Sequence, residues 1–242
     1  MAKVLPAGLA GHPALWRGKQ RRHEQAVLAT GHARLDQALP GGGWPLGDTV
    51  ELLTARPGLG EFSLLLPALA QVTAAGRWAL LVNPPWTPYP PTLCGHGVNL
   101  ARLLLVQAPR AEDALWACEQ ALRGLHGGMV LAWAPPTARF AQLRRLQLAA
   151  RSGSKVAILF RAAGAAASAT PAPLRLHLQA GGDELQLRVL KCRGAKPEGL
   201  IRLRQAQRGP QAAVQAEPGE ATAAMRRPPG ESRRRPMPEA RP

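Results

Sequence analysis

The feature that most constrains this chain is a glycine-containing loop between an apolar strand and an apolar helix, within residues 30–66. Residues 49–53 have the composition of a short buried strand, and a loop with Pro57, Gly58 and Gly60 follows them. Strand, glycine-containing loop and helix, in this order, form the arrangement that cradles phosphate groups. The sequence therefore predicts an α/β domain organised around a phosphate-binding loop.

The side chains that would bind a nucleotide are replaced. Such a loop needs Gly, four residues, Gly, Lys and then Ser or Thr. With Gly60 as the second glycine, Ala55 falls on the first, Glu61 on the lysine and Phe62 on the hydroxyl. A charge pair about 4 Å apart is worth roughly 4 kcal/mol at an effective dielectric of ~20, so Glu61 replaces an attraction for phosphate by a repulsion. We expect a vestigial loop (Ala55, Gly58, Gly60, Glu61, Phe62) with no cofactor and no bound metal.

The strand ends that should supply a catalytic carboxylate also lack one. Phosphoryl transfer needs an acidic residue at such a position. The apolar run 129–133 ends in Trp133 and is followed by Ala134, and the run 79–83 ends in Asn83 before two prolines. Both absences agree with the replaced lysine, so we expect the protein not to be an enzyme.

Apolar runs and helical patterns alternate beyond the loop. Continuous apolar runs predict buried parallel strands at 79–83, 103–106, 129–133 and 155–160. Helical periodicity predicts helices at 63–75, 111–126 and 139–151. The predicted fold class is therefore α/β, with a mostly parallel sheet flanked by helices.

Near the end of the domain, apolar residues recur at every second position. Residues 174–179, 184–191 and 200–204 alternate apolar and polar side chains, which predicts an antiparallel β extension of the sheet. Its polar face would be basic, formed by Arg175, His177, Arg188, Arg202 and Arg204. The preceding segment 161–173 is small, flexible and aperiodic, so we expect a mobile loop there.

The chain divides into three segments. Residues 1–28 are expected to form a basic N-terminal arm, 29–205 the α/β domain, and 206–242 a disordered Pro/Arg-rich tail. Three scattered cysteines and the absence of a membrane-spanning apolar run indicate a cytoplasmic protein with no membrane contact. Trp44, Trp86 and Tyr89 lie in Gly- and Pro-rich loops, where they would cover an edge of the core or stack on bases.

A formal charge of +16 favours an anionic partner such as nucleic acid or an acidic protein surface, although an Arg-rich surface without a partner stays open. The candidate contacts to a partner or to DNA are basic residues and one aromatic: Trp16, Arg17, Arg188, Lys191, Arg193, Arg226, Arg227, Arg233, Arg234 and Arg235.

Several stretches of the chain resemble known families. TGHARLDQALPGGGWPLGDTVEL, from Thr30, is similar to the segment that opens the ATPase core of RecA recombinases. More closely, six words resemble the RecA-related ImuA family: HPALWRG at 12–18, LDQALPGGGWPLG at 35–47, LLLPALA at 64–70, NPPWTPYPPTL at 83–93, LWACEQALR at 115–123 and LRRLQLAARSG at 143–153. They occur in one order and cover roughly residues 12–205.

The resemblance implies a RecA-like core with a degenerate P-loop and a non-catalytic accessory role in SOS-induced translesion DNA synthesis. The implied partners are an ImuB-like relative of Y-family polymerases, RecA and an error-prone DNA polymerase III alpha-type subunit, while direct DNA contact stays open. One alternative is a SulA-like inhibitor of FtsZ and cell division, which the LWRG word and the long basic tail disfavour. Another is a divergent RecA paralogue with residual ATPase activity, which Glu61 disfavours.

Overall fold

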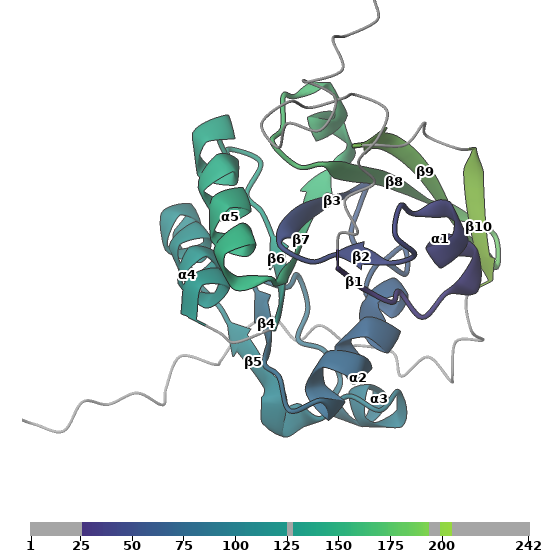
Figure 1. Cartoon of the computed structure of the whole chain (residues 1–242), viewed down its shortest axis with the longest axis horizontal. Helices are drawn as coiled ribbons and strands as arrows, with labels where there is room; N and C mark the ends of the chain where they lie inside the picture. The colour runs from purple at the N-terminus through teal and green to yellow at the C-terminus, as the bar shows by residue number, and fades with distance from the viewer. Residues whose placement is uncertain (1–25, 125–127, 194–198, 205–242) are drawn as a thin grey trace, which may run out of the picture. The chain divides into compact units, whose positions relative to one another are not determined.

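The computed structural model describes residues 26–124, 128–193 and 199–204 (Figure 1). The predictions for most of the N-terminal arm and for the C-terminal tail lie outside these residues. This holds for seven of the candidate contacts: Trp16, Arg17, Arg226, Arg227, Arg233, Arg234 and Arg235.

An eight-stranded sheet runs through the domain in the order β10-β9-β8-β3-β7-β6-β4-β5. Its parallel part contains β3 (Asp48–Thr54), β4 (Ala79–Val82), β5 (Leu103–Val106), β6 (Met129–Trp133), β7 (Val156–Ala162) and β8 (Leu174–Gly181). The antiparallel extension continues from β8 through β9 (Glu184–Cys192) to β10 (Leu200–Arg204). The predicted α/β class, with a mostly parallel sheet and an antiparallel extension, is confirmed. A separate pair joins β1 (Val27–Leu28), within the predicted arm, to β2 (Trp44–Pro45).

Helices cover both faces of the sheet (Figure 1). The helices are α1 (Ala33–Ala38), α2 (Leu66–Ala74), α3 (Pro90–Gly95), α4 (Ala111–Gly124) and α5 (Phe140–Gly153), with 3-10 turns η2 (Ser63–Leu65), η3 (Leu100–Arg102) and η4 (Ala163–Ala167). α4 and α5 share one apolar cluster with Leu80, Val130 and Leu159, whereas α1, α2 and α3 pack on the opposite face. None of the described helices combines the length and apolar composition needed to cross a bilayer.

The strand at 103–106 differs from the prediction. It forms β5 at one end of the sheet, where its register partner is β4, and Leu104 and Leu105 are 41% and 44% exposed. The prediction of a buried strand was wrong because a continuous apolar run is also compatible with an edge position. Local composition does not give the order of strands in a sheet.

The segment 161–173 contains more regular structure than its composition predicts. β7 continues to Ala162 and η4 follows it directly. The guanidinium of Arg175, on β8, donates hydrogen bonds to the carbonyls of Ala165 (2.6 Å), Ala166 (3.1 Å) and Ser168 (3.2 Å). Arg175 is therefore buried beneath this loop, so the predicted basic face of the extension is covered at this residue.

Candidate functional site

The predicted phosphate-binding loop connects the end of β3 to η2. Gly58 and Gly60 have φ angles of +88° and +98°, which place their backbones where a side chain would be strained. These two glycines allow the chain to turn sharply between Thr54 and the start of η2 at Ser63. The loop thus has the connection that the sequence predicts, from a central strand into an apolar helical segment.

The side chain of Glu61 occupies the loop from within. Its Oε1 accepts a hydrogen bond from the backbone N–H of Gly58 at 2.7 Å, and its Oε2 accepts one from the N–H of Leu59 at 2.7 Å. Consecutive backbone N–H groups that converge in this way form an anion-binding concavity, and both bonds to the carboxylate are charge-assisted. Glu61 is only 3% exposed. The residue at the lysine position therefore supplies the loop with an anion of its own.

Aromatic rings occupy the positions where a metal ion would need oxygen ligands. The rings of Trp133 and Phe160 stack with centroids 4.3 Å apart, and the ring of Phe62 lies 6.5 Å from that of Trp133. Trp133 is the last residue of β6 and pairs in register with Phe160 of β7. Phe62 stands where the hydroxyl is expected, and Trp133 where the strand-end carboxylate is expected. Neither side chain can supply an oxygen to Mg²⁺.

The loop aromatics have different environments. A Cβ atom added at Gly58 would lie 3.3 Å from the ring of Trp86, so this ring rests beside the vestigial loop. Trp86 remains 51% exposed and Tyr89 59% exposed, which keeps both available to a partner. Trp44 is fully buried in the main core and covers no edge. The prediction of an edge position was therefore wrong for Trp44.

The described basic candidates lie on β9 or directly after it, two strands away from β3. Arg188 and Arg193 are exposed. Lys191 is partly buried and donates a hydrogen bond from Nζ to the carbonyl of Thr170 at 3.0 Å. Burial lowers the pKa of Lys191, the nearby Arg193 and Arg175 lower it further, and Glu51 acts in the opposite direction. Lys191 is thus engaged in holding the loop at 161–173.

A buried ionic cluster was not predicted. Glu51, at the centre of β3, is 0% exposed and accepts hydrogen bonds from Arg161 Nη1 (3.1 Å), Thr170 Oγ1 (2.7 Å) and Arg175 Nε (2.7 Å). Buried charges of this kind are retained only when paired and hydrogen-bonded. The sequence signal that could have indicated this cluster is a glutamate within a mainly apolar strand, TVELL. The cluster fixes the loop after β7 to the sheet.

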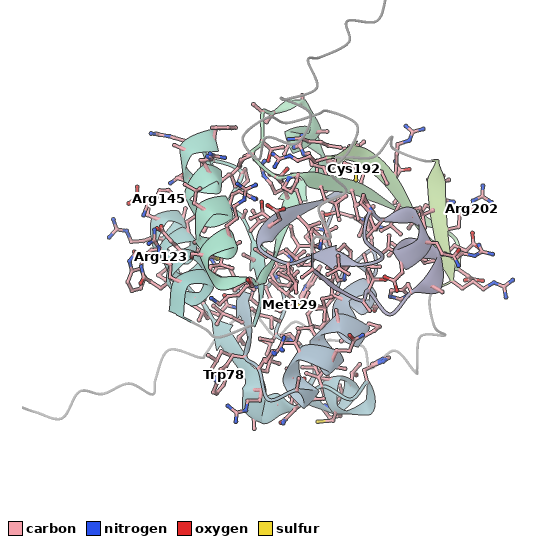
Figure 2. The ribbon with its side chains drawn as sticks, viewed as in Figure 1. Trp78, Arg123, Met129, Arg145, Cys192 and Arg202 are labelled. Carbon is pink, nitrogen blue, oxygen red and sulfur yellow. The ribbon has the colours of Figure 1, made fainter. Side chains whose placement is uncertain are left out.

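A second acidic residue joins the two helices of the opposite apolar cluster. Glu119 of α4 is nearly buried and pairs with Arg123 at 2.9 Å and with Arg145 of α5 at 2.5 Å. Figure 2 shows both arginines on the same side of the domain. A small groove of about 230 Å³ lies beside this pair, between α4 and α5. Arg145 therefore serves helix packing and is not a free cation.

Comparisons with known proteins match the part of the chain that carries this site. The family model described as "Cell division inhibitor SulA" matches residues 49–157, from β3 into β7. The cell division inhibitor SulA of Edwardsiella piscicida is 33% identical over 98 residues, which are 40% of this chain and 58% of that protein. The RecA protein of Leptospira biflexa is 33% identical over 103 residues, 43% of this chain and 26% of its own length. Protein RecA 1 of Myxococcus xanthus is 33% identical over 106 residues, which are 44% of this chain and 31% of that protein.

The chain is similar to both SulA and RecA proteins over less than half of its length. The α/β architecture agrees with this relationship, and the predicted kinship to RecA is confirmed at this level. The chain spans 58% of the length of the SulA relative and less than a third of the two RecA relatives. The activities and partners of those whole proteins therefore reach this RecA/SulA-like chain only as proposals, as does the narrower resemblance to the ImuA family.

Proposed function

We propose that this protein is a non-catalytic accessory adaptor in SOS-induced translesion DNA synthesis. The observation that carries the proposal is the carboxylate of Glu61, bound by the N–H groups of Gly58 and Leu59. In a nucleotide-binding loop such groups bind phosphate. Here they are satisfied by the chain itself, so the loop reaches its folded conformation without a nucleotide.

Nucleotide binding would require several unfavourable steps. The Glu61 carboxylate would have to leave two charge-assisted hydrogen bonds and a buried position before phosphate could approach. No lysine stands at position 61 to replace the lost attraction, which is worth roughly 4 kcal/mol per charge pair at an effective dielectric of ~20. Phe62 and Trp133 supply no ligand to the metal ion that accompanies ATP. The core then serves as a rigid platform for other proteins.

The partner assignment rests on the resemblance to the ImuA family. It names an ImuB-like relative of Y-family polymerases, RecA and an error-prone DNA polymerase III alpha-type subunit. Exposed apolar side chains favour protein contacts of this kind, since they are enriched in interfaces. Leu104 and Leu105 lie on the edge strand β5, and Trp116 of α4 is 61% exposed. The exposed Arg188 and Arg193 add positive charge for a contact with DNA.

A second candidate is inhibition of cell division through FtsZ. The match of residues 49–157 to the SulA family model favours it, together with the SulA relative from Edwardsiella piscicida. A binding platform without nucleotide suits this role as well. The two candidates differ in the partner that the platform recognises.

Binding measurements with purified partners test the proposal. The full chain is immobilised and titrated separately with an ImuB-like protein, RecA, the polymerase subunit and FtsZ. Saturable binding of the ImuB-like protein or RecA, without FtsZ binding, supports the adaptor role. Binding of FtsZ alone overturns it in favour of the second candidate. ATP hydrolysis that disappears on substitution of Gly58 or Gly60 would overturn both candidates and restore the enzyme alternative.

A further inference from the structure

The outer edge of the antiparallel extension has the properties of a peptide-binding groove. β10 is the last strand of the sheet, and among the described residues its register partner is β9 alone. A strand in this position presents backbone N–H and C=O groups that another extended chain can pair with. Addition of a peptide strand to a sheet edge is a recurring mode of protein recognition.

A helix borders this edge and makes a groove of it. A cavity of about 500 Å³ lies between α1 and β10, lined by His32, Ala33, Arg34, Glu184, Arg202, Leu203 and Arg204. Its walls are the first turn of α1 and the outer strand of the sheet. The Nε2 atom of His32 lies 3.1 Å from the carbonyl oxygen of Leu64, which ties this wall to the main core. The groove therefore has a helical wall beside the edge strand, in addition to the charged side chains of that strand.

The charge of the groove selects its occupant. Arg34, Arg202 and Arg204 are exposed, and Glu184 is the one acidic residue among those that line the cavity. Figure 2 shows Arg202 at the outer edge of the sheet. Since the residues of β10 alternate between exposed and buried, Arg202 and Arg204 point to one face, about 7 Å apart. Leu203 lies between them on the opposite, apolar face.

We propose that this groove binds an extended acidic peptide of a partner protein, which adds as a further strand along β10. The peptide would alternate Asp or Glu, facing Arg202 and Arg204, with apolar residues that face Leu203 and Ala33. The chain's own residues 205–242, which follow β10, are disfavoured as occupants. They carry seven arginines against four glutamates and would meet a groove of the same charge sign. The proposal goes beyond the adaptor role, because it assigns a ligand chemistry to a surface away from Glu61.

The test uses a fluorescent, end-capped octapeptide that alternates aspartate and valine, and fluorescence anisotropy with the full-length protein. The double variant Arg202→Glu/Arg204→Glu is compared with the matched variant Arg188→Glu/Arg193→Glu, which changes the net charge equally but lies outside the groove lining. We expect saturable binding that weakens about tenfold or more in the first variant and less than about threefold in the second. Circular dichroism of each variant checks that the fold is retained.

Backbone methylation separates strand pairing from simple charge attraction. In an extended peptide the amides of alternate residues point to opposite sides, so methylation of all aspartate amides and of all valine amides blocks opposite edges. Pairing with β10 in one strand direction predicts that one methylated peptide loses binding and the other retains it. Equal binding of both methylated peptides, absence of any binding, or equal loss in the two charge variants would overturn the proposal. So would a groove variant that weakens binding of a dT oligonucleotide but not of the peptide. Every variant leaves Glu61 intact, so these results do not depend on the loop that carries the adaptor proposal.

Discussion

Removal of the Glu61 carboxylate is the most informative single change, because this group holds the loop together. Glu61→Ala deletes two hydrogen bonds of 2.7 Å, to the N–H groups of Gly58 and Leu59. A hydrogen bond to a charged group contributes about 1.5–3 kcal/mol. The loss of two would cost about 3–6 kcal/mol if water could not reach either N–H group in the variant. Gly58 is exposed, and water will reach its N–H group after truncation. We therefore expect the free energy of unfolding to fall by about 2–4 kcal/mol.

Urea denaturation followed by circular dichroism measures this change. With a slope of about 2 kcal/mol per molar urea, the midpoint should fall by about 1–2 M. Glu112→Ala is the control, since Glu112 is exposed in the first turn of α4 and should contribute less than about 1 kcal/mol. An unchanged midpoint for Glu61→Ala, or an equal change in the control, would refute the role given to this carboxylate. The variant should gain no ATP binding, because the lysine and the hydroxyl remain absent.

Four further outcomes follow from the contacts and the burial of single residues. Glu51→Ala leaves two buried arginines without their anion and should destabilise the protein by about 3–5 kcal/mol, so thermal denaturation that is unchanged would contradict the buried cluster. Gly58→Ala should cost about 1–2 kcal/mol, measured by urea denaturation, because φ is +88° and the new Cβ would lie 3.3 Å from the ring of Trp86. Burial raises the pKa of the Cys118 thiol from 9.0 to about 12. The unfolded chain therefore loses this proton at a lower pH than the folded protein does. The stability contributed by the buried neutral thiol is complete below pH 9 and is lost as the pH rises from 9 to 12. At about pH 8, iodoacetamide should label the exposed Cys94 and not Cys118, as mass spectrometry of peptides can show; equal labelling would contradict the buried thiol.

The sequence predicted the main elements because their signals are local. Glycines 58 and 60 after an apolar strand indicate the loop, and continuous apolar runs indicate parallel strands. The replacements at Glu61 and Phe62 were visible by position alone. The aromatic stack was only half visible, since Trp133 could be placed at a strand end but its partner Phe160 depends on the pairing of β6 with β7.

Other features depend on contacts between distant residues. The partners of Glu51 lie 110, 119 and 124 positions further along the chain, so no local pattern reveals them. For the same reason the burial of Arg175 was not predicted, because an alternating strand gives no sign that a loop covers one of its basic residues. The exposure of β5 depends on strand order, and the bonds of Glu61 depend on the backbone angles of two glycines. The spacing of residues in the sequence predicts neither the strand order nor these backbone angles.

The central claim is that the vestigial loop is filled by its own carboxylate and needs no nucleotide. Isothermal titration of the purified full-length protein with ATP and Mg²⁺ tests it most directly. The account predicts no saturable heat up to about 1 mM nucleotide, and the same result for Glu61→Ala. Saturable binding at micromolar concentration by the unaltered protein would contradict the account, because phosphate would then displace Glu61 from the N–H groups of Gly58 and Leu59.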